Sequence, residues 1–490
     1  MHLLLNITAI EIVDPAADTT LLQWLRESQH LTATKEGCAV GDCGACTVIV
    51  GELEHGAIVY RSVNACIALL GSLDGCHLIT LDILQGSVLN KGLHPVQQAM
   101  VDCHSSQCGF CSPGFVMSLV VWWLNTPANQ LATPEAFAKH RHGVELALSG
   151  NLCRCTGYHP ILLAADQLAP LDRPTVRAMD PLFDQVGGYD NCLAQLSNMA
   201  SLSQSQSHAR NVSSQAYIAP SSLDELALAY EAFPQTRLVA GSTDLALDIT
   251  HGLKSIDRLI DVTGVAELRS IEQHGNQIYI GAAVSLSAVE AFCQKDLPAM
   301  SDLLGRFASR QIRNRGTLVG NIANSSPIAD IPPLLLVMDA QLILQRGLDQ
   351  RTIPLKEFNL DYKQTALKTG EFIHSVILPL PLSGQRVSVE KVSKRSEDDI
   401  SATCVAMSVT IEHGTITQVN IACGGMAAIP KMASETQSQL LGQPLTHELV
   451  AQVPLWLAQD YQPIDDMRAS AAYRQQVTAN LIQGFLKEAM

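Results

Sequence analysis

The chain has 490 residues, of which 47% are hydrophobic and only 16% charged, and its formal net charge is −15 at pH 7. A chain of this length can bury several separate cores, so we expect three or four domains. The acidic balance argues against a nucleic-acid partner, because nucleic-acid binding needs a basic face.

Fourteen cysteines are many for a chain of this size. They indicate either disulfides in an oxidising compartment or metal binding in a reducing one. A signal peptide needs a basic region, a long apolar segment and a cleavage site with small residues. Residues 1–6 show none of these features. The apolar run at 115–124 is too short to span a bilayer. We therefore expect a cytoplasmic protein with no membrane association, whose cysteines mostly bind metal clusters.

Residues 1–82 are expected to form a small β-rich domain. Helical spacing from Leu21 to Ser28 follows Thr20, a possible N-cap. Strands are predicted at 47–50 and 57–60, on either side of a turn at 51–56.

The loop at 36–48 reads EGCAVGDCGACTV. Its C-x4-C-x2-C spacing is the one with which plant-type ferredoxins hold three of the four thiolate ligands of a 2Fe–2S cluster. A zinc site or a redox-active pair is the alternative, but zinc usually takes paired C-x2-C knuckles. Glycines in the loop allow a tight bend and let backbone N–H groups face the sulfurs. The cysteines that match the plant-type ligand order are Cys38, Cys43, Cys46 and Cys66.

A second cysteine set lies in residues 83–168, where helices are predicted. Each of its two pairs precedes an apolar run of helical length, and Pro113 suits the first turn of one helix. Helix N-termini stabilise thiolates, so the two pairs can converge on one metal centre. A zinc-stapled helical hairpin is the alternative, although a C-x-C pair is unusual for zinc. The pairs are Cys108 with Cys111 and Cys153 with Cys155.

Residues 169–212 are expected to be a linker, since the prolines at 170–174 and the Ser/Gln stretch at 201–207 cannot bury much apolar surface. Strands then alternate with helices from 213 to 385. Residues 386–490 look like a separate α+β unit, with a hairpin turn at His413-Gly414 and a closing helix at 471–487.

Two segments combine glycine with hydroxyl or amide side chains. The segment at 237–245 predicts a strand, a tight turn and a helix start, which can bind phosphate or be only a helix cap. The segment at 307–330 can carry a diphosphate over the backbone around Gly320-Asn321, with Asp330 accepting hydrogen bonds from the ligand, or be an ordinary loop. The mixed-charge stretch at 391–399 is typical of a solvated surface. No Rossmann or Walker sequence is present, so those sites are disfavoured.

The two cysteine sets, followed by these two segments, resemble the xanthine dehydrogenase family of molybdenum hydroxylases. The chain is similar to the iron–sulfur and FAD subunit of that family over nearly its whole length. The most specific segments are QCGFCSPG at 107–114 and NLCRCTGY at 151–158. The resemblance implies an α+β multidomain fold. Its parts are a β-grasp plant-type ferredoxin domain, a four-helix 2Fe–2S domain, a two-part α+β FAD-binding domain and a C-terminal α+β domain like that of carbon monoxide dehydrogenase flavoproteins.

By this resemblance, the first cysteine set binds the cluster nearer the flavin and the second set binds the cluster nearer the molybdenum cofactor. Val319 departs from the family, which often has two glycines before the asparagine. The interval from Cys111 to Cys153 is longer than usual, with the excess placed at 127–143. The implied FAD contacts are Leu238, Val239, Ala240, Gly241, Ser242, Thr243, Asp244, Leu245, Phe307, Thr317, Leu318, Val319, Gly320, Asn321, Asp330, Ile373 and Lys391. The cysteines without a ligand role, expected to be buried and free, are Cys76, Cys103, Cys192, Cys293, Cys404 and Cys423.

The implied function is electron transfer. A partner's molybdopterin cofactor would hydroxylate a purine, hypoxanthine or xanthine, and the electrons would pass through two 2Fe–2S clusters to FAD and finally to NAD. No residue of this chain is implied as a catalytic acid or base. The implied partner is a large molybdopterin-binding subunit in an α2β2 hetero-oligomer. The alternatives are the equivalent subunit of a hydroxylase of aldehydes, carbon monoxide or N-heterocycles, a stand-alone NAD(P)H-dependent iron–sulfur flavin reductase, and a non-enzymatic zinc scaffold.

Overall fold

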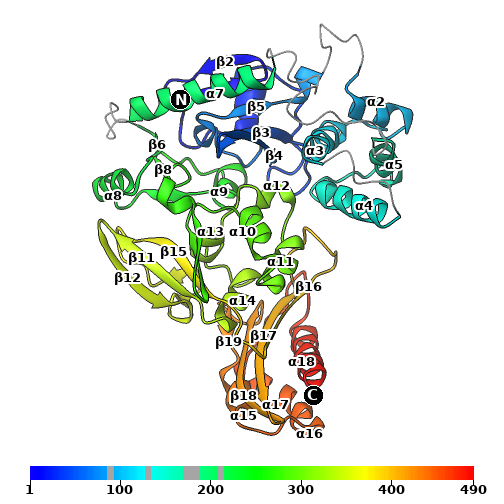
Figure 1. Ribbon diagram of the computed structural model, residues 1–490, viewed down its shortest axis with the longest axis vertical. Helices are drawn as coiled ribbons and strands as arrows, with labels where there is room; N and C mark the ends of the chain where they lie inside the picture. The colour runs from blue at the N-terminus through cyan, green and yellow to red at the C-terminus, as the bar shows by residue number, and fades with distance from the viewer. Residues whose placement is uncertain (85–92, 127–133, 169–187, 208–214) are drawn as a thin grey trace. The chain divides into compact units, whose positions relative to one another are not determined.

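The computed structural model describes residues 1–84, 93–126, 134–168, 188–207 and 215–490 (Figure 1). It divides into two compact units. Unit 1 contains residues 1–221, 236–261 and 309–315, and unit 2 contains residues 222–235, 262–308 and 316–490. The expected α+β multidomain class is confirmed. Among the described residues, no helix has the length and apolar character needed to cross a membrane.

Unit 1 begins with a five-stranded sheet in the order β2-β1-β5-β3-β4, in which β1 and β5 are parallel. Thr20 caps the helical turn that packs on this sheet, and its hydroxyl accepts a hydrogen bond from the N–H of Gln23 at 3.2 Å, as predicted. The elements are β1 (His2–Leu5), β2 (Thr8–Glu11), α1 (Leu21–Gln23), a π-helical turn (Trp24–Ser28), β3 (Thr47–Glu54), β4 (Ala57–Asn64) and β5 (His77–Ile79).

The predicted turn at 51–56 is wrong over most of its length, because β3 continues to Glu54. The chain reverses only at His55 and Gly56, which have φ angles of 48° and 77°. Gly51 gives room to a neighbouring ring, since a Cβ there would lie 2.5 Å from a ring carbon of Tyr60. Gly51 therefore makes space for the Tyr60 ring within a strand and is not the turn residue that the sequence had suggested.

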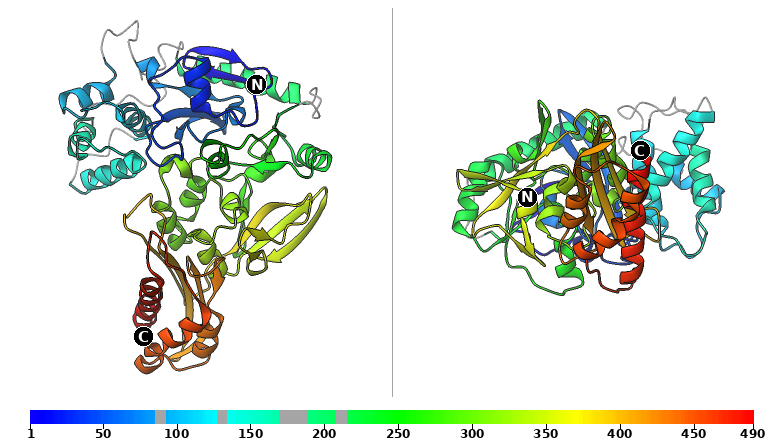
Figure 2. Two further views of the ribbon diagram at one scale, coloured as in Figure 1. Left: turned by 180° about the vertical axis from the view of Figure 1, so that it is seen from behind. Right: turned by 90° about the horizontal axis from the view of Figure 1, so that it is seen from below.

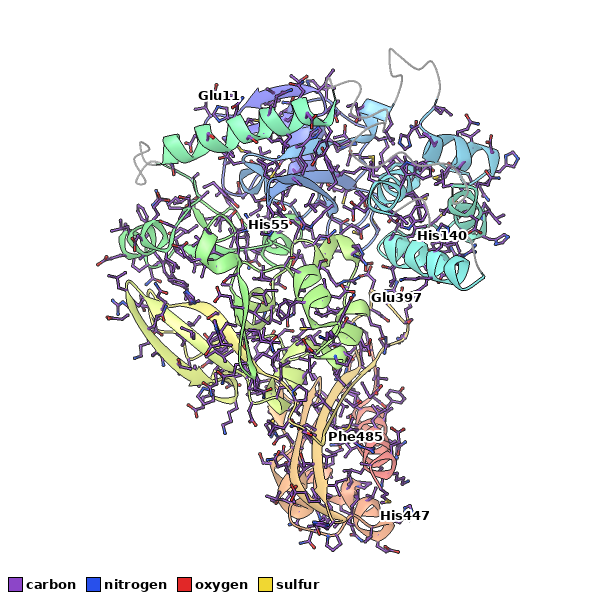
Figure 3. The ribbon with its side chains drawn as sticks, in the orientation of Figure 1. Glu11, His55, His140, Glu397, His447 and Phe485 are labelled. Atoms are coloured by element: carbon purple, nitrogen blue, oxygen red, sulfur yellow. The ribbon has the colours of Figure 1, made fainter. Side chains whose placement is uncertain are left out.

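In its described residues, 93–126 and 134–168, the second part of unit 1 contains four helices, as the resemblance implies. Pro113 lies in the first turn of α3, and ten of the fourteen residues of this helix are buried. His140 lies on α4 (Figure 3). Its ring packs edge-on against Trp122 of α3, with the ring centroids 5.0 Å apart. The helices are α2 (Pro95–Asp102), α3 (Ser112–Asn125), α4 (Pro134–Leu148) and α5 (His159–Leu168).

Part of the predicted linker is a helix, α7 (Tyr189–Ser207), which runs along β1 and β3 (Figure 1). The expectation of a linker at 169–212 is therefore wrong for this stretch, while residues 169–187 and 208–212 lie outside the described residues. Four side chains recur at intervals of three and four and are buried against the sheet, as in an amphipathic helix. They are Tyr189, Cys192, Leu196 and Met199. The many Ser and Gln residues of this stretch made its apolar face hard to recognise in the sequence.

His77 is buried beneath α7 and is held as a neutral ring. Its Nε2 lies 2.8 Å from the carbonyl oxygen of Asn6, and its Nδ1 lies 3.0 Å from the Tyr60 hydroxyl and 3.3 Å from Cys192 Sγ. Burial lowers the pKa of His77 to about 4, against a weaker opposing effect of the Asn6 hydrogen bond. The ring therefore stays neutral at pH values where an unfolded histidine takes up a proton.

We expect the stability of unit 1 to fall on acidification between about pH 6.5 and pH 4. A histidine whose pKa is lowered by folding binds its proton more readily in the unfolded chain, so its contribution is lost as the pH falls. The expected loss from pH 8 to pH 5 is about 2 kcal/mol. Urea unfolding at the two pH values measures it, and a His77→Gln variant should lose that part of the dependence. An unchanged dependence in the variant would contradict this.

The last part of unit 1 is a three-stranded parallel sheet in the order β6-β8-β7. The predicted strand, turn and helix start at 237–245 are confirmed as β7 and α9. The short helix α12 also belongs to this unit. The elements are β6 (Tyr217–Ile218), β7 (Arg237–Val239), α9 (Leu245–Thr250), β8 (Leu259–Asp261) and α12 (Arg310–Arg313).

Unit 2 contains a five-stranded antiparallel sheet in the order β12-β11-β15-β10-β9. Its strands are β9 (Ile271–His274), β10 (Gln277–Gly281), β11 (Gln341–Arg346), β12 (Asp349–Pro354) and β15 (Phe372–Pro379). A small hairpin is formed by β13 (Asn359–Asp361) and β14 (Gln364–Thr365). The helices are α8 (Leu223–Ala232), α10 (Leu286–Cys293), α11 (Pro298–Gly305), α13 (Leu318–Ala323) and α14 (Ile331–Val337).

The C-terminal part of unit 2 is a four-stranded antiparallel sheet, and α18 runs beside its strands (Figure 2). The predicted hairpin at His413-Gly414 is confirmed, with φ angles of 49° and 78° that suit a tight reversal. Phe485 of α18 packs against the core under the sheet (Figure 3). The elements are β16 (Gln385–Val392), β17 (Thr403–Glu412), β18 (Thr415–Gly424), β19 (Lys431–Met432), α15 (Ser434–Leu440), α16 (His447–Ala451), α17 (Val453–Asp460) and α18 (Ala471–Glu488).

Candidate cluster and flavin sites

The structure brings the first cysteine set together. Cys46 Sγ and Cys66 Sγ lie 3.3 Å apart. Hydrogen bonds from the thiols of Cys43 and Cys66 hold the pKa of Cys38 well below its usual range. The four sulfurs therefore form one connected group, as the plant-type spacing predicts.

Backbone N–H groups face this sulfur group. The N–H groups of Val40 and Cys43 point at Cys38 Sγ at 3.5 and 3.3 Å. Gly37 is needed for the close approach, because a Cβ there would lie 2.7 Å from Cys43 Sγ, and Gly41 has a φ of 80°. Such N–H groups stabilise negative sulfur, so the loop fits a 2Fe–2S cluster.

The second cysteine set also converges, at the N-terminus of α3. Cys111 is the N-cap residue of that helix, and its thiol and that of Cys153 are hydrogen-bonded. Burial, and then this hydrogen bond, raise the pKa of Cys111 to about 12. The thiols of Cys108 and Cys155 form the other contact. The predicted convergence of the two pairs is present.

Both sets consist of thiols in direct contact. In the described part of the chain, no group of three or more His, Cys, Asp or Glu side chains is arranged to hold a metal ion. The fit to clusters therefore depends on the donor chemistry, four thiols in each group, and on the N–H groups around them. The role of each cysteine as an iron ligand stays a prediction.

The two cysteine loops touch each other. The N–H of Leu152 donates to the carbonyl oxygen of Cys43 at 3.0 Å, and Asn151 Nδ2 donates to the carbonyl oxygen of Gly44 at 3.2 Å. Glycines permit this approach. A Cβ on Gly114 would lie 2.1 Å from the Gly44 oxygen, and a Cβ on Gly44 would lie 2.1 Å from the Gly150 oxygen. The loop of the first set is thus held between the start of α3 and the segment before Cys153.

The surroundings of the two sets differ in exposure. Cys46 and Cys66 are buried, whereas Cys108 and Cys155 are exposed. Beside the exposed pair, Phe110 is 48% exposed. The second set therefore lies at the surface of unit 1.

The first flavin segment, residues 238–245, falls in unit 1 and contacts the first cysteine loop. The Ser242 hydroxyl donates to the carbonyl oxygen of Ile67 at 2.6 Å, directly after Cys66. At the other end of α9, the Thr250 hydroxyl donates to the carbonyl oxygen of Ala39 at 2.7 Å. The Ser242 hydroxyl therefore donates its proton within the protein. The backbone N–H groups of the turn are the donors that a phosphate could use.

The second flavin segment, residues 317–321, forms the start of α13 in unit 2. The alternative of an ordinary loop is wrong here, because Thr317 caps a helix and its hydroxyl accepts from the N–H of Gly320 at 2.9 Å. Leu318 and Val319 are buried. Asn321 Oδ1 is buried and has no hydrogen-bond partner among the described residues. An unsatisfied buried acceptor next to the exposed Gly320 fits a bound polar ligand.

Lys391 is buried, so the prediction of a solvated surface is wrong for this residue. Its Nζ lies 2.9 Å from Asp330 Oδ2 and 5.7 Å from the centre of the Phe307 ring. Asp330 also accepts a hydrogen bond from the Ser401 hydroxyl. The carboxylate expected to bind a ligand is thus engaged by protein groups, since a buried charge requires a partner. Ile373 lies buried in β15.

We expect Lys391→Met to destabilise unit 2 by about 3 to 5 kcal/mol, because it leaves the Asp330 carboxylate buried without its cation. The side chains of the pair are only 2% and 5% exposed, so solvent gives little relief. Urea unfolding of the flavin-free protein measures the change. A Lys391→Met/Asp330→Leu double variant should recover most of the loss. A single variant within about 1 kcal/mol of the wild type would exclude this role for the ion pair.

Five of the six remaining cysteines are buried as predicted, while Cys103 is half-exposed at the end of α2. Of the predicted excess at 127–143, residues 127–133 lie outside the described residues and the rest belongs to α4. Sequence reasoning also missed Asn151 and Gln311, which contact the cysteine loops. The Gln311 amide belongs to no motif, and Asn151 begins the NLCRCTGY segment, whose cysteine spacing does not indicate a role for the amide.

Four domain families match successive parts of the chain. A 2Fe-2S iron-sulfur cluster binding domain matches residues 4–70, and a [2Fe-2S] binding domain matches residues 80–166. The FAD binding domain in molybdopterin dehydrogenase matches residues 210–381. The CO dehydrogenase flavoprotein C-terminal domain matches residues 389–489.

Curated relatives include the xanthine dehydrogenases of Drosophila subobscura and Emericella nidulans. The first is 31% identical over 90% of this chain and 35% of its own length, and the second is 32% identical over 89% of this chain and 34% of its own length. The chain thus spans about a third of the length of the curated relatives it matches.

Solved structures with a similar fold include carbon monoxide dehydrogenase from Hydrogenophaga pseudoflava. One of its chains is 26% identical, with a TM-score of 0.52, and the match covers 55% of this chain and 94% of that chain. Quinoline 2-oxidoreductase from Pseudomonas putida 86 matches with a TM-score of 0.52 at 23% identity, over 56% of this chain and 96% of that chain, and supports the fold alone.

These matches confirm that the chain contains two 2Fe–2S domains and an FAD-binding domain, in the predicted order. The boundaries of the domains stay a prediction. The order of its four domains is that of the iron–sulfur and flavin part of molybdenum hydroxylases, and the chain belongs to that family as an electron-transfer component with 2Fe–2S and FAD domains.

Proposed function

We propose that the chain is the iron–sulfur and FAD subunit of a xanthine dehydrogenase, an enzyme that hydroxylates a purine and reduces NAD. The observation that carries the proposal is the extent of the relatives' match. Xanthine dehydrogenase from Drosophila subobscura aligns with 90% of this chain, across both 2Fe–2S domains and the flavin domain. The carbon monoxide dehydrogenase chain covers only 55%.

The proposed work of this chain is to hold redox groups at fixed positions. Bound 2Fe–2S clusters each carry one electron, and a bound flavin exchanges one or two, so together they can link a two-electron oxidation to NAD. Cys38, Cys43, Cys46 and Cys66 are the proposed ligands of one cluster. The proposed ligands of the other are Cys108, Cys111, Cys153 and Cys155. Asn321 and the backbone at 238–245 are proposed to contact FAD.

The proposed partner is a large molybdopterin-binding subunit in an α2β2 assembly. One observation of the structure supports a partner. Cys108 and Cys155 of the second set are exposed beside Phe110, which is itself 48% exposed. An exposed aromatic side chain next to a redox centre suits a surface that another protein covers. The partner would desolvate Cys108 and Cys155.

The second candidate is the same subunit in a hydroxylase of carbon monoxide, an aldehyde or an N-heterocycle. The fold likeness to carbon monoxide dehydrogenase favours it, because substrate chemistry belongs to the partner. A stand-alone NAD(P)H-dependent iron–sulfur flavin reductase is a further alternative, which would reduce its clusters with NADH in the absence of any large chain.

Purification from the native host under anaerobic conditions tests these candidates. We expect a brown protein that contains FAD, co-purifies with a large molybdenum-containing chain, and forms NADH when given xanthine. Turnover of carbon monoxide, an aldehyde or a quinoline in place of xanthine would favour the second candidate. NADH-dependent cluster reduction by a preparation with no partner would favour the reductase.

A further inference from the structure

A buried polar network joins both cysteine loops to the short helix α12. Its centre is Gln311, which is 1% exposed. Gln311 Nε2 lies 3.2 Å from Asn151 Oδ1, 3.2 Å from Ser118 Oγ and 3.5 Å from Thr47 Oγ1. Thr47 directly follows Cys46 of the first set, and Asn151 lies two residues before Cys153 of the second. One amide therefore contacts the supports of both cysteine sets.

The residues that Gln311 contacts are themselves hydrogen-bonded to the cysteine loops. The Ser118 hydroxyl donates to Asn151 Oδ1 at 2.7 Å, which leaves Asn151 Nδ2 to donate to the Gly44 carbonyl oxygen. The Thr47 hydroxyl donates to the same oxygen at 2.7 Å. Gly44, between Cys43 and Cys46, is thus fixed by two side chains that Gln311 itself touches.

The position of Gln311 is in turn fixed by unit 1. Ser309 is fully buried and caps α12, and its Oγ accepts from the N–H of Ile312 at 3.3 Å. A Cβ on Gly150 would lie 2.4 Å from Gln311 Oε1, so only glycine leaves room for the amide. That Oε1 is buried and has no partner among the described residues. Burying an unsatisfied acceptor costs about 1 to 3 kcal/mol.

We propose that Gln311 is a positioning residue that locks the two cysteine loops together and so sets a single separation between the two metal centres. The inference rests on the proposed function only in taking both cysteine sets as cluster ligands. Without the amide, Asn151 and Thr47 no longer contact a common side chain. The hydrogen bonds to the Gly44 carbonyl oxygen and from the Leu152 N–H should then adopt several geometries instead of one. Electron exchange depends steeply on separation, so a fixed spacing is the property such a lock supplies.

The test compares Gln311→Met with Asn314→Ala in the protein reduced by dithionite. Methionine keeps the volume and removes the amide. Asn314 is the control, since it is the C-cap residue of α12 and its Nδ2 donates to the Ser62 carbonyl oxygen of β4 at 2.9 Å. The readout is the spin–spin splitting between the two reduced clusters in electron paramagnetic resonance. It needs no partner, purine or NAD.

We expect the wild type and Asn314→Ala to show one well-defined splitting. Gln311→Met should retain its iron and both cluster signals while the splitting is lost or spread over many values. An identical splitting in Gln311→Met, or none in a wild type that contains both clusters, overturns the proposal. A wild type without clusters overturns the proposed function instead.

If Gln311→Met does not fold, the Ser118→Ala variant tests the proposal in its place. It removes the hydroxyl that orients Asn151 and accepts from Gln311 Nε2, while Gln311 keeps its contacts with Asn151 and Thr47. The splitting should broaden in the same direction, and an unchanged splitting counts against the lock. Hydrogen exchange gives a second reading, because the Leu152 N–H that bonds to Cys43 should exchange at least tenfold faster in either variant.

Discussion

Gly114→Ala is expected to destabilise unit 1 by about 3 kcal/mol or more. The new methyl group would lie 2.1 Å from the carbonyl oxygen of Gly44, and a backbone atom cannot move aside as a flexible side chain can. The gain in helix propensity, about 1 kcal/mol, is too small to compensate. Because Gly44 lies between Cys43 and Cys46, the variant should also lose iron. Urea unfolding followed by tryptophan fluorescence, together with iron analysis, measures both effects.

Gly143→Ala is the matched control for this variant. Gly143 also lies in a helix of the four-helix domain, but the nearest atom to its Cβ would be Trp122 Nε1 at 3.9 Å, an ordinary contact. It should therefore stabilise the protein by up to about 1 kcal/mol through helix propensity. Equal effects of the two substitutions would show that the approach of Gly114 to Gly44 has no special importance.

Cys43→Ala is expected to lower the iron content from about four to about two per FAD, since each 2Fe–2S cluster needs four thiolates. The second set has its own four cysteines and should keep its cluster. In the proposed enzyme, NAD-linked turnover should fall to background, while a purine should still reduce the molybdenum of the proposed partner. Iron analysis, absorption spectra and NADH formation measure these effects.

Cys293→Ala is the control for Cys43→Ala, because Cys293 is also a cysteine, is 1% exposed in α10 and matches no ligand position. It should retain about four iron atoms per FAD and normal NADH formation. Full NADH production by Cys43→Ala would show that the first cysteine set takes no part in the pathway.

The sequence predicted the local features that short-range chemistry determines. The Thr20 cap, Pro113 in the first turn of α3 and the His413-Gly414 hairpin depend on neighbouring residues, and all three are confirmed. The convergence of each cysteine set was also predictable, because cluster ligands have characteristic spacings.

The features that were missed depend on distant parts of the chain. Helix α7 looked like a linker because its polar face dominates its composition, and its apolar stripe becomes evident only against the sheet. Lys391 looked solvated because its partner Asp330 is 61 residues away in the sequence. Gln311 reaches Asn151 across 160 residues. No local pattern reports such pairs.

The most direct test of the account is electron paramagnetic resonance of the anaerobically purified chain after full reduction, combined with iron and FAD analysis. The account predicts two distinct 2Fe–2S signals of equal intensity for each FAD, one from each cysteine set. A single signal, or a colourless protein containing zinc when isolated from iron-supplied cells, would contradict it.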